Sequence, residues 1–483
     1  MKGLLKRSLL IVGIFVFVWI PFIYSWRINN RLPNVSEITS SLIVLPIALI
    51  AILYLSGKLW RNGFALIQSR VETNTQEPLD DVREASDALE RHNSIAVLAS
   101  AIRSAHGNSP EELSIQLKLN EARISLDPEL KDHNGFPILS SRISGIDENA
   151  QLNKMLSWAQ LNKRESLAWT DEQLRAITLG SEVVIELMKQ AVKHPLFDEY
   201  VTAQSKNLEV LEVPMLQLLA LLPQSWKDEE RSHVTDWFFH LIQDLGWPEE
   251  RITFRPEILS LANRTMDSID RLMLESFRSG HSFFTIVIAC ESHIGELTIQ
   301  NWEAEGKLFD QRRRDTKIPG EGAAGLLLTD SIQAPLYELD TISRLHRVVQ
   351  SRHNKSADSI GFIDDELMAN IMQQALTLSK IPVEKITLIS SDTDHRSSRL
   401  IELLSNGFKI FPDLDPDTQY FKLASNCGEM GAVTSLAALV LAHHKVITDS
   451  EAVLSISNND GYERTSVVLS SWADSATLLT TST

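Results

Sequence analysis

Cysteine is scarce in this chain of 483 residues, which contains only Cys290 and Cys427. Two thiols in so long a chain do not form a disulfide framework, and neither has the His/Cys spacing of a metal site. The sequence also lacks a phosphate-binding P-loop and the Gly-x-Ser-x-Gly motif of serine hydrolases. We therefore expect no metal and no cofactor, and the few thiols fit a reducing, cytosolic compartment.

An excess of basic residues is also missing, because 46 Lys and Arg face 63 Asp and Glu, and the net charge is −17. Binding of nucleic acid requires clustered Lys and Arg, so the composition argues against a nucleic-acid partner. The 43% of hydrophobic residues suffices for a sizeable core. A short basic run, Arg312–Arg314, is better explained as a solvated face or a partner-docking patch than as a phosphate site.

Long uncharged runs occur near the N-terminus. Ser8–Trp26 follows three basic residues and is long enough to cross a hydrocarbon core of roughly 30 Å. Ser41–Gly57 is shorter and contains Pro46. Residues 1–62 are thus predicted to form a hairpin of two transmembrane helices, and the flanking Lys and Arg predict that both ends lie in the cytoplasm. A cleaved signal peptide is disfavoured, because the first run is long and a second run follows at once.

The rest of the chain has the pattern of an α/β protein. Residues 63–92 are polar and acidic, which is typical of a linker, and short apolar runs then alternate with helical patterns. The strand candidates are Ser94–Ser100, Phe283–Cys290, Gly325–Thr329, Ile386–Ser391 and Ser466–Ser471, and Pro214–Pro223 is a further buried apolar run. The helix candidates are Thr235–Leu245, Thr265–Arg278, Ser397–Leu404 and the Ala- and Leu-rich segment after Gly431. Continuous apolar strands between helices predict sheets that are covered on both faces.

Three segments carry glycines and polar residues beside such strands. Phe309–Asp330 contains the turn Pro-Gly-Glu-Gly-Ala-Ala, with Glu321 at its centre, and an apolar strand follows. Glycine permits a tight turn there, and the small alanines permit close packing. Ile386–Glu402 runs from an apolar strand through a polar loop into a helix. Ala424–Leu441 has a loop of small residues before a long apolar helix.

In this order, the three segments resemble the β-ketoacyl synthase branch of the thiolase-like (condensing-enzyme) fold. The resemblance covers roughly Phe283–Ser471 and implies a layered αβαβα architecture, with an N-terminal α/β half at residues 93–255 and a ketoacyl-synthase-like C-terminal α/β region at residues 256–483. Enzymes of this family commonly dimerise through the strand after the nucleophilic helix. The matching strand here is Phe283–Cys290, so a homodimer could form through it.

The reactive residues of that family are missing from the matching positions. A condensing enzyme uses a nucleophilic Cys at the start of a helix, where the thiolate is stabilised, and two basic side chains, usually His. The matching helix, Thr265–Arg278, follows Leu261–Arg264 and has no cysteine at its start. The two histidine positions fall at or near Ser391 or Asp392 and at or near Asn426 or Cys427. The resemblance therefore implies a pseudoenzyme without condensing activity.

The polar residues left at these positions have two interpretations each. Asp392, Asp394, His395 and Arg399 could bind a ligand or metal, but a capped helix with Asp394 or Ser397 at its N-cap is the preferred interpretation. Cys427 could be a displaced nucleophile, although a buried thiol in a glycine turn is favoured. The predicted vestigial site or ligand pocket consists of Asp392, Asp394, His395, Asn426, Cys427, Gly428 and Glu321.

A second resemblance concerns the whole chain. N-terminal membrane segments, a linker, a degenerate condensing-enzyme body and the segment Leu126–Asp147 together look like the bacterial adaptors that accompany lipase effectors of type VI secretion. This implies a non-catalytic protein of the bacterial inner membrane, with its body in the cytoplasm, that binds a lipase effector and helps to load it on the secretion spike. The alternatives are a membrane-associated acyl-thioester-handling enzyme or acyl-CoA binder, which would use Cys427 or His395, and a structural membrane component.

Overall fold

The computed structural model describes residues 92–164, 167–205, 213–258, 264–280, 282–338, 341–359 and 365–472. The two predicted transmembrane runs, and the linker apart from its last residue, lie outside the described residues. Within the described ranges, no helix is both long enough and apolar enough to cross a membrane.

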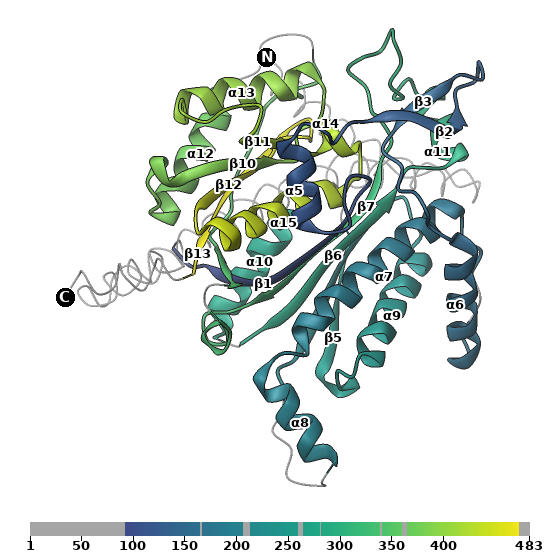
Figure 1. The fold of residues 1–483 in the computed structure, drawn as a ribbon, viewed down its shortest axis with the longest axis vertical. Coiled ribbons are helices and arrows are strands. Elements are labelled where there is room, and N and C mark those ends of the chain that lie inside the picture. The colour runs from purple at the N-terminus through teal and green to yellow at the C-terminus, as the bar shows by residue number, and fades with distance from the viewer. Residues whose placement is uncertain are drawn as a thin grey trace, which may run out of the picture. The chain divides into compact units, whose positions relative to one another are not determined.

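Strands and helices alternate along most of the described chain (Figure 1). The strands are β1 (Ile95–Arg103), β2 (Ser125–Lys131), β3 (Pro137–Ser140), β4 (Leu216–Leu222), β5 (Ile252–Ile258), β6 (Phe284–Ser292), β7 (Glu321–Thr329), β8 (Ser343–Leu345), β9 (Val349–Arg352), β10 (Ile386–Ser391), β11 (Tyr420–Lys422), β12 (Ala452–Ser457) and β13 (Glu463–Ser471). The α-helices are α5 (Pro110–Lys118), α6 (Glu148–Leu161), α7 (Asp171–Ala191), α8 (Pro195–Ser205), α9 (Asp228–Asp244), α10 (Arg264–Ser279), α11 (Glu296–Ala304), α12 (Asp365–Ser379), α13 (Ser397–Ile410), α14 (Leu423–Cys427) and α15 (Ala432–Asp449). Short 3₁₀ turns are η2 (Glu249–Arg251), η3 (Ala334–Leu336) and η5 (Val383–Lys385).

Eleven strands form one continuous sheet in the order β11-β10-β12-β13-β8-β1-β7-β6-β4-β5, in which β9 pairs with β13. β4, β5 and β6 are parallel, as are β10, β11 and β12, whereas β7 and β13 are antiparallel to their neighbours. The short strand β8 joins the two halves by pairing with β1 and β13. β2 and β3 form a separate hairpin.

Neighbouring side chains in the strands face different layers. In β6, Val287 belongs to the core cluster that contains α15, whereas Ile286 belongs to a second cluster that contains α7. In β12, Val453 faces the α15 cluster and Leu454 faces a third cluster that contains α12. α15 therefore lies between the two halves of the sheet, with α7 on the outer side of one half and α12 on the outer side of the other (Figure 1). This is the helix–sheet–helix–sheet–helix layering that the sequence predicts.

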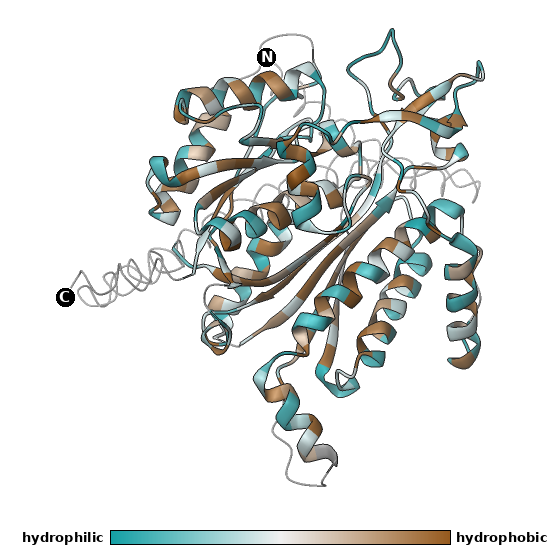
Figure 2. Ribbon diagram, viewed as in Figure 1, coloured by the Kyte–Doolittle hydropathy of each residue, from teal (hydrophilic) through white to brown (hydrophobic). Residues whose placement is uncertain are grey.

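Hydropathy follows the layers. The strands are largely apolar, whereas α7 and α9 alternate between apolar and polar residues, as expected of helices that cover one face of a sheet (Figure 2). The five predicted strands coincide with observed strands, the buried run Pro214–Pro223 contains β4, and the predicted helices correspond to α9, α10, α13 and α15. The predicted Thr235–Leu245 helix is the C-terminal part of α9, which begins at Asp228.

Two expectations concern β6 and the division of the body. β6, which contains most of Phe283–Cys290, pairs with β7 on one side and with β4 on the other, and the strand at this end of the sheet is β5. A homodimer through Phe283–Cys290 stays a prediction. The boundary expected between residues 255 and 256 falls inside β5, and β6 and β7 share a sheet half with β4.

Candidate functional site

The three glycine-containing segments converge in space. Pro319 forms a bridge with Glu429, whose amide donates to the carbonyl of Ile318 at 2.8 Å. The amide of Ser425 donates to the carbonyl of Thr393 at 3.1 Å, which joins the second segment to the third. A Cβ atom at Gly320 would collide with the carbonyl oxygen of Cys427, so only glycine permits this approach. The predicted site residues of the second and third segments thus lie close together. Glu321 is the first residue of β7, the strand that follows the glycine turn of the first segment.

Gly428 is needed at this junction for its own backbone conformation. Its φ of +72° lies in the region that L side chains rarely adopt, and an added Cβ would lie 2.9 Å from the carbonyl oxygen of Pro319. Gly428 is therefore a structural residue of the loop.

Asp392 follows the last residue of β10 and is buried, with 1% of its surface exposed. Its carboxylate accepts hydrogen bonds from the hydroxyls of Ser435 (2.8 Å) and Ser457 and from the amides of Asn458 (2.8 Å) and Asn459 (3.1 Å). Burial raises its pKa, although these four donors act in the opposite direction. The carboxylate is therefore already saturated by donors from two other segments of the chain.

Asp394 precedes α13, and Arg399 lies in its first turn. The Asp394 carboxylate accepts a hydrogen bond from the backbone amide of Arg396 at 3.0 Å and forms an ion pair with the guanidinium group of the same residue. Arg399 is fully buried and pairs with Asp358 at 3.0 Å. The N-cap position is held by Arg396 and not by Asp394 or Ser397, so that detail of the prediction is wrong. Ser397 instead donates from its amide and its hydroxyl to Asp315.

His395 lies apart from these carboxylates in the hydrogen-bond network. Its ring packs edge-on against Phe309, with ring centroids 5.3 Å apart. Its Nε2 atom is buried and has no hydrogen-bond partner among the described residues. Asp392, Asp394 and His395 do not form a three-ligand cluster that could hold a metal ion; in the described part of the chain such a cluster occurs elsewhere, at Asp132, His133 and Glu303.

Asn426 and Cys427 are held in place by the protein. The Asn426 amide group donates to the carbonyl of Ala122 at 2.7 Å, and its backbone carbonyl contacts the imidazole of His106 at 2.9 Å. Cys427 is 1% exposed and lies in the α15 core cluster. Burial raises the pKa of its thiol to about 12, so the thiolate that a nucleophile requires is not formed near neutral pH.

Glu321 is a buried structural carboxylate. It binds the guanidinium group of Arg175 through both oxygens, at 2.6 and 2.8 Å. It also accepts from the amide of Ile143 at 2.7 Å and from the hydroxyl of Ser292 at 2.9 Å. These bonds tie the first segment to α7 and β6, so Glu321 fixes the fold beside the site.

A second buried network, which no sequence motif indicates, lies next to Asp392. Glu402 of α13 accepts from Arg464 of β13 at 2.8 and 2.9 Å, contacts the imidazole of His353 at 3.0 Å and accepts from Asn458 at 3.4 Å. Burial alone would raise the pKa of Glu402, but His353 and Arg464 lower it. The nearest of these partners is 49 residues away from Glu402 in sequence, so no local pattern announces the network.

Glu429 in the third segment is a further buried acid of the site. Burial alone would raise its pKa, but Lys317, His293 and Arg396 lower it to about 2. Its side chain also accepts from Asn459 at 3.3 Å, and Asn459 donates its amide to Asp392. The acids at the junction are therefore linked to one another through neutral and cationic donors, and these bonds hold the loops together.

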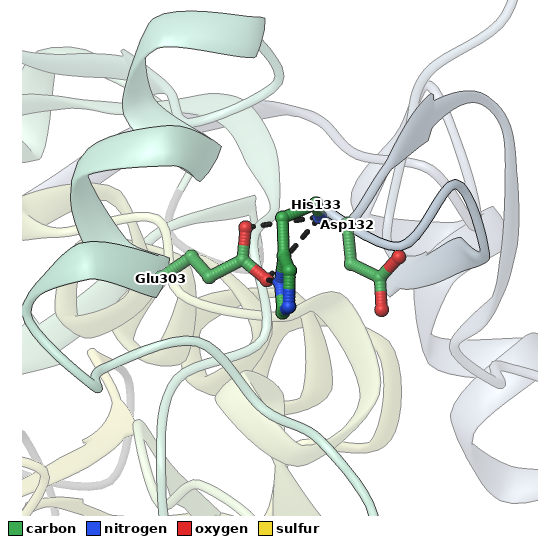
Figure 3. Close-up of side chains that lie close together, drawn as sticks. All are labelled: Asp132, His133 and Glu303. Atoms are coloured by element: carbon green, nitrogen blue, oxygen red, sulfur yellow. Dashed lines mark hydrogen bonds and ion pairs between the residues drawn. The ribbon is translucent and has the colours of Figure 1, made fainter.

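A separate cluster lies on the hairpin of β2 and β3, beside α11. Asp132 and His133 come from the turn between the two strands, and Glu303 comes from α11; the imidazole lies between the two carboxylates (Figure 3). All three side chains line a groove of about 1060 Å³ that also contains the exposed Phe136 and Leu126. Asp132 and His133 fall within Leu126–Asp147, the segment that carries the adaptor resemblance in the sequence.

Comparison with protein-family models and with curated proteins finds no match. Solved structures of ketosynthases do match. One is a type II polyketide-synthase acyl-carrier protein in complex with its ketosynthase bound to the hexaketide; the match has 12% identity and a TM-score of 0.52, and covers 78% of this chain and 99% of that one. Another is a β-ketoacyl synthase from Burkholderia phymatum, with 14% identity, a TM-score of 0.50 and the same coverages.

A third match is the ketosynthase from module 1 of the bacillaene synthase of Bacillus amyloliquefaciens, with 14% identity and a TM-score of 0.50, covering 80% of this chain and 73% of that one. At such identities, the likeness establishes the fold alone. The chain therefore has a mixed α/β fold of the thiolase-like, ketosynthase type, as its sequence segments predict.

Proposed function

We propose that the protein is a non-catalytic adaptor that binds a lipase effector and assists its loading on the type VI secretion spike, with the ketosynthase-like body as a pseudoenzyme scaffold. The observation that carries this proposal is the state of Asp392. It lies at or near the position at which the resemblance places a reactive histidine, and four donors of the protein saturate its carboxylate. A group that is fully hydrogen-bonded inside the fold is not available to polarise a substrate.

The state of Cys427 supports the same conclusion. Burial raises the pKa of its thiol well above the neutral range, and the sulfur is buried among apolar side chains. This argues against the alternative function, an enzyme that carries an acyl group as a thioester on this residue. His395 is also a poor candidate for acyl-group chemistry, because its Nε2 atom is buried against the protein.

A role in protein binding is compatible with the use of this fold elsewhere, since one of the similar ketosynthases is described in complex with an acyl-carrier protein. The proposed location is the inner membrane, with the body in the cytoplasm. This rests on the two apolar N-terminal runs and their basic flanks. The proposed partners rest on the whole-chain resemblance, in particular on Leu126–Asp147.

Affinity purification of the full chain from its native host tests the proposal. We expect a lipase and a secretion spike protein among the captured proteins, identified by mass spectrometry, and the same capture by a Cys427→Ala variant. In parallel, the purified chain is incubated with acyl-CoA and its intact mass is measured. Absence of both partners would contradict the adaptor role. A stable acyl adduct that disappears in Cys427→Ala but persists in Cys290→Ala would establish the acyl-handling alternative instead.

A further inference from the structure

Three potential metal ligands from distant parts of the chain meet on the wall of the hairpin groove. Each of Asp132, His133 and Glu303 offers one ligand atom, and these atoms all lie within 4.8 Å of one another. Glu303 is 170 residues from His133 in sequence, so the fold itself brings the set together. The set mixes one imidazole with two carboxylates, which is a donor combination found in protein zinc sites.

We propose that Asp132, His133 and Glu303 form a binding site for a first-row divalent metal ion of the zinc type. Zinc bonds to nitrogen and oxygen ligands are about 2.0–2.2 Å long, and in a tetrahedral site two ligand atoms lie about 3.3–3.6 Å apart. The ligand atoms here all lie within 4.8 Å of one another, and side-chain rotations would bring them to that spacing. An imidazole ligand favours zinc, nickel or copper over magnesium and calcium, which prefer oxygen ligands alone.

The surrounding bonds hold two of the three ligands in position. One oxygen of Asp132 accepts from the amides of Asn134 at 2.9 Å and Phe136 at 2.8 Å, while its other oxygen has only a long contact of 3.4 Å with the Asn134 side chain. Both oxygens of Glu303 accept from the amide of His133, at 3.1 and 3.3 Å. Glu303 also bonds directly to the His133 imidazole, so the carboxylates are held beside the imidazole and an ion would replace that direct bond.

The environment of the site gives it a consequence for partner binding. The hairpin and α11 share a small core of Leu130, Ile138, Ile294, Ile299 and Leu308, so the metal would clamp a module that is already packed. The His133 side chain is 69% exposed, and the groove beside it is open to solvent. An ion with three protein ligands keeps a further coordination position, and here that position would be open to a ligand in the groove.

Titration calorimetry of the purified, chelator-treated full chain with Zn²⁺ at neutral pH tests the site. We expect one equivalent to bind, with Mg²⁺ and Ca²⁺ failing to compete. His133→Gln and Glu303→Gln should each weaken this binding by about tenfold or more. The matched control is His240→Gln, which removes another histidine paired with a carboxylate, Asp244 at 3.3 Å, but without a third ligand.

Location and folding are checked by hydrogen exchange. Zn²⁺ should slow exchange at the hairpin turn around residues 132–136 in the native protein and in His240→Gln, and not in His133→Gln. The proposal is overturned if the native chain binds no Zn²⁺, or if His133→Gln and Glu303→Gln, shown to be folded by circular dichroism, bind it as tightly as the native chain. In that case the three residues only dock the hairpin on α11. The outcome is independent of whether a lipase is the partner.

Discussion

Replacing Glu402 by Gln should cost about 3–5 kcal/mol of unfolding free energy, because it leaves the buried Arg464 without its counter-charge. Neither side chain of this pair is exposed, and Arg464 already has one nitrogen, Nη2, with no hydrogen-bond partner among the described residues. A guanidinium that loses its carboxylate in such a place cannot turn to water. Replacement by glutamine keeps the side-chain shape, so the loss reports on charge and hydrogen bonding.

Urea unfolding of the full chain, followed by tryptophan fluorescence, measures the loss from the shift of the transition midpoint. The matched control is Glu463→Gln, which breaks the pair of Glu463 with Arg352, whose side chains are 26% and 61% exposed. An exposed pair of this kind is worth about 0–1 kcal/mol. If Glu402→Gln costs no more than Glu463→Gln, the buried network does not stabilise the fold and the reasoning is refuted.

The pH dependence of the same variant follows from the pKa of Glu402, which its partners lower in the folded state. A carboxyl group whose folded pKa is lowered contributes stability above its unfolded pKa and loses it as the pH falls through the folded pKa. The difference between the native chain and Glu402→Gln should therefore be full near neutral pH and shrink below about pH 4.5. A double variant, Glu402→Leu with Arg464→Leu, should recover part of the loss, because no charge is left unpaired.

Other outcomes can be predicted for single residues. Iodoacetamide at pH 8 should leave Cys290 and Cys427 unmodified in the native protein and modify both in urea, by mass spectrometry, because both thiols are buried and their pKa values are raised; native-state modification of Cys427 would contradict its buried placement. Gly320→Ala should destabilise the chain by about 2 kcal/mol, since the new Cβ meets backbone atoms, whereas Gly461→Ala, whose nearest contacts are side-chain atoms, should cost clearly less in the same unfolding assay. Burial lowers the pKa of His443 to about 3, so the native chain should lose stability as the pH falls from about 6.5 towards 3, and His443→Asn should flatten that loss; an unchanged pH profile would show that His443 does not titrate as stated.

The sequence predicted the strands well where burial on both faces makes them continuously apolar. β6 and β10 are of this kind, and they are found within one or two residues of the predicted positions. α7 was missed, although its N-terminus has a full capping box formed by Thr170 and Gln173. Its inner face contains Gly180, which approaches Phe238 and Cys290 so closely that no larger residue fits. A glycine and several β-branched residues obscured the pattern of this helix, which its capping box and its packing stabilise.

The sequence could single out residues of the candidate site, but it could not predict the hydrogen bonds that these residues form. Asp392, Asp394 and Asn426 could be picked out, because they follow apolar segments at positions where the resemblance expects reactive groups. The donors that saturate Asp392 come from residues 43 to 67 positions further along the chain, and only the fold brings them together. The ligands on the hairpin were missed for the same reason, since Glu303 is far from Asp132 and His133 in sequence and no short motif joins them.

The loop around Asp392 and the hairpin groove differ in how easily a binding partner could reach them. Opening the loop around Asp392 would break four hydrogen bonds to a buried carboxylate, and bonds to a charged group are worth about 1.5–3 kcal/mol each. A ligand that opened this loop would have to compensate for the loss of these hydrogen bonds. The hairpin groove has the opposite character, because Phe136 is 68% exposed and Leu126 is 63% exposed. Covering large exposed apolar side chains lowers the free energy, so the groove is a better surface for a partner than the loop around Asp392.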